Sequence, residues 1–137
     1  MAFWKLYYHI VWGTKNRLPL ITEQMEEQLY KYITMKSEEL KSITHALGGI
    51  DDHIHLVVSI PPALSISEYV GKIKGSSSHF VNHRFDNSQF FVWQEKYGVF
   101  SLGSKQLDDA VDYVVKQKEH HYTGSIIPVL EKYDDKD

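Results

Sequence analysis

Residues 53–60 form the segment that most narrows the folds open to this chain, because a stiff apolar strand is predicted there. The sequence reads HIHLVVSI, and residues two apart on a strand project to the same side. One face is therefore predicted to be apolar, made of Ile54, Leu56, Val58 and Ile60. His53 and His55 are predicted to project together from the opposite face. Two neutral imidazoles on one side of a rigid strand form half of a metal site.

The length and composition of the chain predict a single domain with one core. It has 137 residues, of which 42% are hydrophobic and 24% charged. No apolar run reaches 18 residues and there is no charged-then-apolar leader, so we expect no membrane insertion. The lack of cysteine excludes thiolate chemistry and is typical of a cytoplasmic protein. We assign residues 1–130 to the domain and 131–137 to an acidic, flexible tail.

Strand and helix patterns alternate along the chain in an order that predicts the fold class. Strands are expected at 5–14, at 42–50 with a break at Gly48-Gly49, at 53–60 and within 90–102; helices are expected at 23–41, 66–84 and 104–124. The first six elements give β-α-β-β-α-β, the order of the ferredoxin-like split βαβ fold. This α+β fold has an antiparallel sheet with two helices on one face. The apolar side of residues 53–60 should meet those helices, which leaves both histidines on the open face.

The last predicted helix carries a second pair of polar side chains. Tyr113 and Gln117 are four residues apart and therefore share one helix face. The opposite, apolar side carries Val111, Val114 and Val115 and is expected to be the side that packs on the rest of the protein. The amide oxygen of Gln117 could complete a site for a hard divalent ion held by the two histidines. Such an ion would hold a phosphate for attack by the Tyr113 hydroxyl, giving a covalent phosphotyrosine. The pKa of a phenol is about 10, so attack near neutral pH needs a base or a nearby cation.

Four segments, in this order, resemble the single-tyrosine transposases of the IS200/IS605 type, which belong to the HUH endonuclease superfamily. The segments are YHIVW at 8–12 with TKNR at 14–17, GGIDDHIHLVV at 48–58, WQEKYGVFS at 93–101 and YVVKQKEHH at 113–121. The histidine pair alone is moderately specific. The pair together with Tyr-x-x-x-Gln and the aromatic segment is highly specific, and from first to last the four segments span most of residues 5–121.

The resemblance implies a function and a set of site residues. His53 and His55 would be the paired metal ligands, Gln117 a third ligand and Tyr113 the nucleophile. The ion would be Mg²⁺ or Mn²⁺, and the substrate single-stranded DNA beside an imperfect hairpin at the ends of a mobile element. Cleavage would leave a 5′-phosphotyrosine and a free 3′-OH. Attack by a second 3′-OH on the phosphotyrosine would reverse the cleavage step and join two strands. Members of this family are homodimers in which the tyrosine helix of one subunit can complete the site of the other.

The net charge of the chain constrains how it could bind DNA. The net charge is −3 and the pI is about 6.2, unlike a protein that coats nucleic acid along its length. Positive charge must therefore be concentrated locally, and phosphate contacts would make binding fall steeply with salt. The candidate DNA-binding residues are Lys15, Asn16 and Arg17 in a loop, and Lys72, Lys74 and Arg84 on the second helix.

Two other functions fit parts of the pattern. A non-catalytic single-stranded nucleic-acid-binding protein of the same fold would not need the combination of His53, His55, Tyr113 and Gln117. A metal-dependent phosphodiesterase would use water as the nucleophile and form no covalent intermediate. The remaining histidines have no partner that the sequence reveals, and we assign them structural or surface roles; they include His9, His45, His79 and His83.

Overall fold

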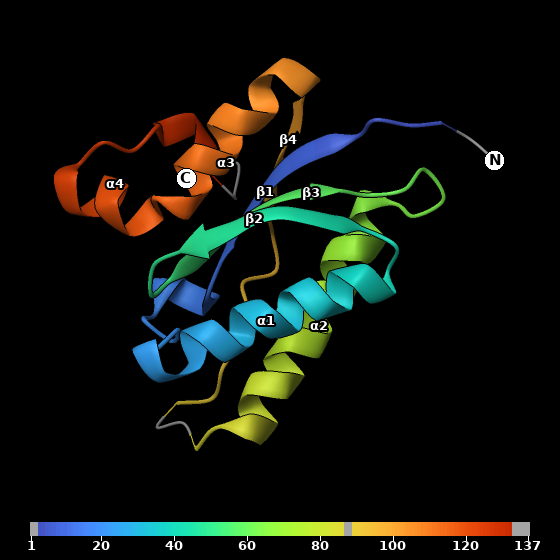
Figure 1. The fold of residues 1–137 in the computed structure, drawn as a ribbon. Coiled ribbons are helices and arrows are strands. Elements are labelled where there is room, and N and C mark those ends of the chain that lie inside the picture. The colour runs from blue at the N-terminus through green and yellow to red at the C-terminus, as the bar shows by residue number, and fades with distance from the viewer. Residues whose placement is uncertain (1–2, 87–88, 133–137) are drawn as a thin grey trace.

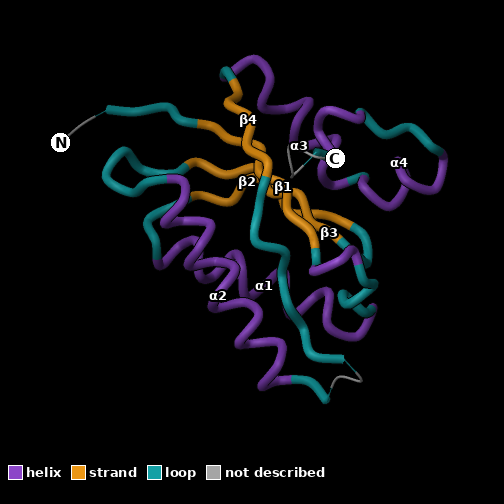
Figure 2. Tube along the Cα trace, turned by 180° about the vertical axis from the view of Figure 1, so that it is seen from behind, coloured by secondary structure: helices purple, strands orange, loops and turns teal. Residues whose placement is uncertain are grey.

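In the computed structural model, which describes residues 3–86 and 89–132, a four-stranded antiparallel sheet separates two layers of helices (Figure 1). The strands are β1 (Tyr7–Gly13), β2 (Ile43–Gly49), β3 (His53–Ser59) and β4 (Gly98–Leu102), in the spatial order β2-β3-β1-β4. Helices α1 (Glu23–Glu39) and α2 (Ile66–Arg84) cover one face, and α3 (Leu107–Val115) and α4 (Gln117–Thr123) lie on the other (Figure 2). The predicted ferredoxin-like order is confirmed, since both central strands pair antiparallel with their neighbours.

The main core lies between the sheet and α1 and α2. Strand alternation sends Ile10 and Trp12 of β1 to this side, and the apolar face of β3 joins them as predicted. Met25, Leu29 and Ile33 recur every four residues on α1 and are buried against the sheet, which is the stripe expected of an amphipathic helix. The second helix begins as predicted, because the Ser65 hydroxyl accepts a hydrogen bond from the Glu68 N–H at 3.1 Å. No helix in the described ranges combines the length and apolarity needed to cross a bilayer.

The last helical segment differs from the prediction in two respects. The predicted single helix is two, because Lys116 has φ −104° and ψ 23° and ends α3 before Gln117 begins α4. The buried side was also assigned wrongly in part: Val115 is 58% exposed, whereas Tyr113 and Gln117 are buried together with Val114. Tyr113 and Gln117 therefore face the sheet instead of turning away from it. The end near Gly124 is confirmed, as this glycine caps α4 with a left-handed φ of 77°.

Gly48 allows α3 to pack closely on the sheet beside the histidine strand. A β-carbon at Gly48 would lie 2.1 Å from the Val114 carbonyl oxygen, which is too close for any other residue without movement of the helix. Gly48 pairs directly with His55 across β2 and β3, so this close approach brings the end of α3 over the histidine. The predicted break at Gly48-Gly49 is wrong, because β2 continues through both glycines and uses the first for helix packing.

Candidate active site

His53 and His55 lie, as predicted, on the sheet face away from α1 and α2. The prediction that this face is open is wrong, because α3 and α4 cover it, and there the two histidines meet the carboxylate of Glu131. His55 is fully buried and His53 nearly so. The Nε2 atom of each ring lies 3.0 Å from the same Glu131 oxygen, Oε1. Glu131 belongs to a 3₁₀ turn, Pro128–Glu131, that follows α4. The sequence assigned Glu131 to a flexible tail, but its carboxylate is held by these rings; residues 133–137 of that predicted tail lie outside the described residues.

The position of Glu131 is fixed by further contacts. His121 of α4 brings a third imidazole, with its Nε2 also 3.0 Å from Oε1. The carbonyl oxygen of Lys132 lies against Gly98 of β4, at a place where a β-carbon would be only 2.1 Å away. Burial alone would raise the pKa of Glu131, but hydrogen bonds from His53 and His55 outweigh burial and hold that pKa far below its usual range. Glu131 is therefore an ionised carboxylate among three imidazoles.

Tyr113, the predicted nucleophile, reaches this carboxylate from the last turn of α3. Its hydroxyl donates a short hydrogen bond to Oε2 of Glu131 and accepts one from the Ile127 N–H at 3.0 Å. Its ring stacks on His120, with centroids 4.8 Å apart, and meets the edge of His55 at 5.9 Å. Burial and the Glu131 hydrogen bond raise the pKa of Tyr113 to about 12. The hydroxyl is thus held in place and protonated.

Gln117, the predicted third ligand, lies in the same cluster, but its side-chain oxygen faces His121. It is buried, and its Oε1 lies 3.2 Å from His121 Nε2. Its Nε2 donates weakly to the Tyr113 carbonyl oxygen at 3.4 Å and to Glu131 Oε2 at 3.5 Å. Gln117 therefore contacts His121 and Glu131, while Glu131 makes the direct contact with both rings of the pair.

The donor set suits a divalent cation. One ligand atom each from His53, His55 and Glu131 lies within 4.8 Å of the other two. Neighbouring ligands of an octahedral ion with bonds of about 2.1 Å are about 3.0 Å apart, which matches the nitrogen–oxygen distances here. Mixed imidazole and carboxylate donors suit Mn²⁺ better than Mg²⁺, which prefers oxygen. The Gln117 amide adds a further oxygen donor to the cluster, so the set of donors suits either ion.

Each histidine of the pair has a partner on its second ring nitrogen. His53 Nδ1 lies 2.7 Å from Asp52 Oδ1, and His55 Nδ1 lies 2.8 Å from His9 Nε2. Burial opposes protonation of His53, but Asp52 and Glu131 outweigh it and raise its pKa to about 9. Burial lowers the pKa of His55, and lowers that of His9 to about 3. The sequence prediction missed these partners, and for His9 only the pairing of β1 with β3 could have revealed it.

The predicted basic residues fall into two groups, one in the turn that follows β1 and one on α2. Lys15, Asn16 and Arg17 form an exposed 3₁₀ turn directly after β1, and Gly13 pairs with His53 at that end of the sheet. The charge of Arg17 helps to lower the pKa of Asp52, so this turn lies within electrostatic reach of the histidine pair. The residues on α2 lie on the far face.

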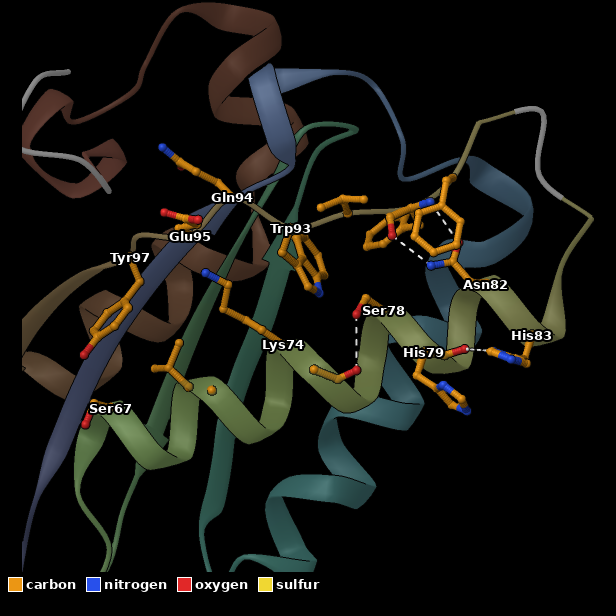
Figure 3. Close-up of a pocket in the computed structure, with 16 residues that line it drawn as sticks. Ser67, Lys74, Ser78, His79, Asn82, His83, Trp93, Gln94, Glu95 and Tyr97 are labelled. Carbon is orange, nitrogen blue, oxygen red and sulfur yellow. Dashed lines mark hydrogen bonds between the residues drawn. The ribbon is translucent and has the colours of Figure 1, made fainter.

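Lys74 on α2 borders a groove of about 610 Å³ between this helix and residues 90–97 (Figure 3). Its ammonium donates to the Lys96 carbonyl oxygen at 3.2 Å, and burial lowers its pKa to about 8. Lys72 and Arg84 are exposed, and Arg84 donates to Gln28 Oε1 at 3.2 Å. The α2 residues therefore form a surface separate from the histidine cluster.

Comparison with known proteins connects this chain to one family. A family model described as "Transposase IS200 like" matches residues 2–117. The chain is 26% identical to the transposase for insertion sequence element IS200 of Salmonella typhimurium (strain LT2) over 131 residues, covering 92% of this chain and 86% of that protein. The transposase for the same element in Salmonella typhi matches equally.

Two solved structures share the fold. One is a protein from Deinococcus radiodurans R1 assigned as a transposase (TM-score 0.69, 21% identity, covering 82% of this chain and 91% of that one). The other is a REP-associated tyrosine transposase bound to a REP hairpin (TM-score 0.65, 15% identity, covering 92% of this chain and 76% of that one). Since the family model matches residues 2–117 of the 137, the chain belongs to the family of IS200-like transposases.

Proposed function

We propose that this transposase cleaves and rejoins single-stranded DNA beside hairpins at the ends of its element, through a 5′-phosphotyrosine on Tyr113. The observation that carries the proposal is that the Tyr113 hydroxyl and the Nε2 atoms of His53 and His55 all contact the carboxylate of Glu131. A nucleophile thus lies next to a group of donors suited to a divalent cation. A protein that only binds nucleic acid has no need of this arrangement.

The proposed reaction exchanges one phosphodiester for another. The Tyr113 oxygen forms a bond to phosphorus, the bond from phosphorus to the 3′-oxygen breaks, and the strand is released with a 3′-OH. The phenol proton is released to solvent as the new bond forms, because Glu131, whose pKa lies far below its usual range, is too weak a base to keep it, and the 3′-oxygen takes up a proton from solvent. Attack by a second 3′-OH reverses these steps and joins two strands. Because each step conserves the number of phosphate ester bonds, no nucleotide cofactor is required.

A divalent ion is the cofactor that this set of residues would hold. His53, His55 and Glu131 are the proposed ligands, and the Gln117 amide, which lies 3.5 Å from Glu131 Oε2, is proposed as a further one. A bound Mg²⁺ or Mn²⁺ supplies positive charge that offsets the phosphate and the developing tyrosinate. Such charge is needed here, since burial and Glu131 raise the pKa of Tyr113 to about 12.

Replacing Glu131 with glutamine tests its proposed role as a ligand. Glu131→Gln keeps the size of the side chain but removes its charge, so the Mn²⁺ dissociation constant is expected to rise at least about tenfold. Electron paramagnetic resonance of free Mn²⁺ measures this directly. The control is Glu119→Gln, an exposed acid on α4, which should leave the affinity unchanged. Unchanged Mn²⁺ affinity with faster cleavage would instead identify Glu131 as a group that blocks the site.

DNA contacts are proposed for the two basic groups. The turn formed by Lys15, Asn16 and Arg17 is exposed at the end of the sheet that carries His53, which suits a strand entering the site. Lys72, Lys74 and Arg84 offer a second set of phosphate contacts on α2. The hairpin in the structure of the REP-associated relative supports a hairpin as part of the DNA. Lysine and arginine contacts to phosphates predict an affinity that falls steeply with salt.

We also propose that the protein acts as a homodimer in the cytoplasm, as the family resemblance implies. In this chain Tyr113 lies beside the histidines of its own sheet. A site completed by the Tyr113 helix of a second subunit would therefore require α3 to leave the contact with Gly48.

The direct test is a covalent adduct. The protein is incubated with Mg²⁺ or Mn²⁺ and a single-stranded oligonucleotide that carries an imperfect hairpin from the DNA beside its own gene. The expected product is a protein–DNA complex that survives denaturing electrophoresis and disappears after protease treatment. Cleavage without an adduct would favour water as the nucleophile, and binding without cleavage would favour the non-catalytic function. A scrambled oligonucleotide without a hairpin is the matched control.

A further inference from the structure

His9 lies directly behind one of the proposed metal ligands, yet it takes no part in the mechanism above. It is fully buried on β1, and its Nε2 is 2.8 Å from Nδ1 of the fully buried His55. The other nitrogen of His55 points at Glu131. The second nitrogen of His9, Nδ1, has no hydrogen-bond partner among residues 3–86 and 89–132. Within these residues, the side chain of His9 is therefore hydrogen-bonded through Nε2 to His55, and its Nδ1 is left without a partner.

The chemistry of imidazole limits what this bond can be. A neutral ring carries one N–H and one lone pair. To bind a cation through Nε2, His55 must keep its proton on Nδ1 and donate it to an acceptor, which is here the Nε2 lone pair of His9. When Nε2 of His55 instead donates to Glu131, Nδ1 is the acceptor and His9 Nε2–H is the donor. A neutral histidine at position 9 can serve both arrangements, because it can either donate or accept.

We propose that His9 is a positioning residue for metal binding, which holds the His55 ring and accepts its Nδ1–H so that the Nε2 lone pair faces the cation. Ligating histidines in proteins commonly have such a partner on the second nitrogen, and its loss typically lowers metal affinity 10–100-fold. Asp52 contacts His53 in the corresponding way, at 2.7 Å. The inference rests on the proposed function, since it assumes a metal at the histidine pair.

Packing makes His9 well suited to hold His55 rigidly. Its ring lies against Phe100 of β4, with centroids 6.0 Å apart, and against Tyr113 at 6.3 Å. His9 pairs with Val57 across β1 and β3, and Val11, two residues further along β1, pairs with His55. Paired residues and residues two apart project to the same side of a sheet, so His9 and His55 share one side. A change at His9 would therefore alter the orientation of His55 without removing any ligand.

The test compares His9→Leu with His9→Gln in the full chain without DNA. Leucine fills the space but cannot accept a hydrogen bond, so the Mn²⁺ dissociation constant should rise about 10–100-fold. Glutamine places an amide near the Nε2 position and can donate or accept, so it should retain the affinity to within about threefold. Electron paramagnetic resonance of free Mn²⁺ gives the affinities, and thermal unfolding without metal gives the stability. His45→Leu is the control, because it removes a histidine bonded to Ser59 at 2.8 Å but not to His55.

The outcomes separate this proposal from the proposed function. If folded His9→Leu binds Mn²⁺ like the wild type, or if the wild type binds no Mn²⁺, the proposal is wrong. If His9→Leu does not fold, His9→Gln is compared with His9→Asn, whose shorter amide cannot reach His55; equal loss of affinity in both would overturn the proposal. Metal binding that depends on His9, in a protein that forms no adduct, would support the role of His9 and refute the proposed reaction.

Discussion

Replacing Tyr113 with phenylalanine is expected to abolish the covalent protein–DNA adduct and to lower strand cleavage by more than about 10³-fold, as loss of a covalent nucleophile does in other enzymes. The substitution removes only the hydroxyl. The ring can keep its stacking on His120 and its edge contact with His55. Loss of activity would therefore reflect loss of the nucleophile and not collapse of the site. Denaturing electrophoresis of reactions with labelled hairpin DNA measures both adduct and cleavage.

The Tyr113→Phe variant should still bind hairpin DNA, since the proposed phosphate contacts lie elsewhere. Circular dichroism and a gel-shift assay at fixed salt provide these controls. A matched variant is Tyr122→Phe, which alters an exposed tyrosine on α4 and should leave the adduct intact. An adduct that survives Tyr113→Phe would show that another residue attacks, and cleavage that persists without an adduct would identify water as the nucleophile.

The second large effect is expected from the histidine pair. His53→Ala or His55→Ala should lower cleavage by about 10³-fold, which corresponds to about 4 kcal/mol of transition-state stabilisation. Each substitution removes one of the three imidazoles that lie 3.0 Å from Glu131 Oε1. Cleavage rates and Mn²⁺ affinity should fall together, because the missing group is a proposed ligand.

His53→Ala is the more informative of these two variants. His53 is the first residue of β3, whereas His55 is fully buried, and its loss would remove the hydrogen bond that His9 makes within the described part of the chain. Far-UV circular dichroism should show that both variants keep the fold, with a lower melting temperature for His55→Ala. His45→Ala, on β2 and away from the cluster, should cleave normally. Normal cleavage by both pair variants would refute the metal assignment.

The sequence predicted the faces of the sheet correctly because strand geometry is local. Alternation in residues 53–60 placed Ile54 and Leu56 in the core under α1 and α2, and both histidines on the other face. Helical spacing likewise predicted that Tyr113 and Gln117 would share a face. Side-chain direction in these elements follows from backbone dihedral angles that repeat at every residue.

The errors concern packing between segments that are distant in sequence. Apolar periodicity alone assigned Val115 to the buried side of the last helix, yet α3 lies over Gly48 in a way that buries Tyr113 instead. No proline or glycine marks the break at Lys116, so no local signal could have predicted it. Glu131 was assigned to a flexible, acidic tail, although in the folded chain its carboxylate lies 3.0 Å from three imidazoles.

By itself the sequence determined which face of β3 carries His53 and His55, and that Tyr113 and Gln117 lie together on a helix. The tertiary structure decided which groups meet those residues. It brought His9 to His55 across 46 residues and Glu131 to the same ring across 76. The physical reason is that periodicity fixes where a side chain points along its own element. Its partner depends on strand register and on the close approach of α3 at Gly48, which only the packed chain defines.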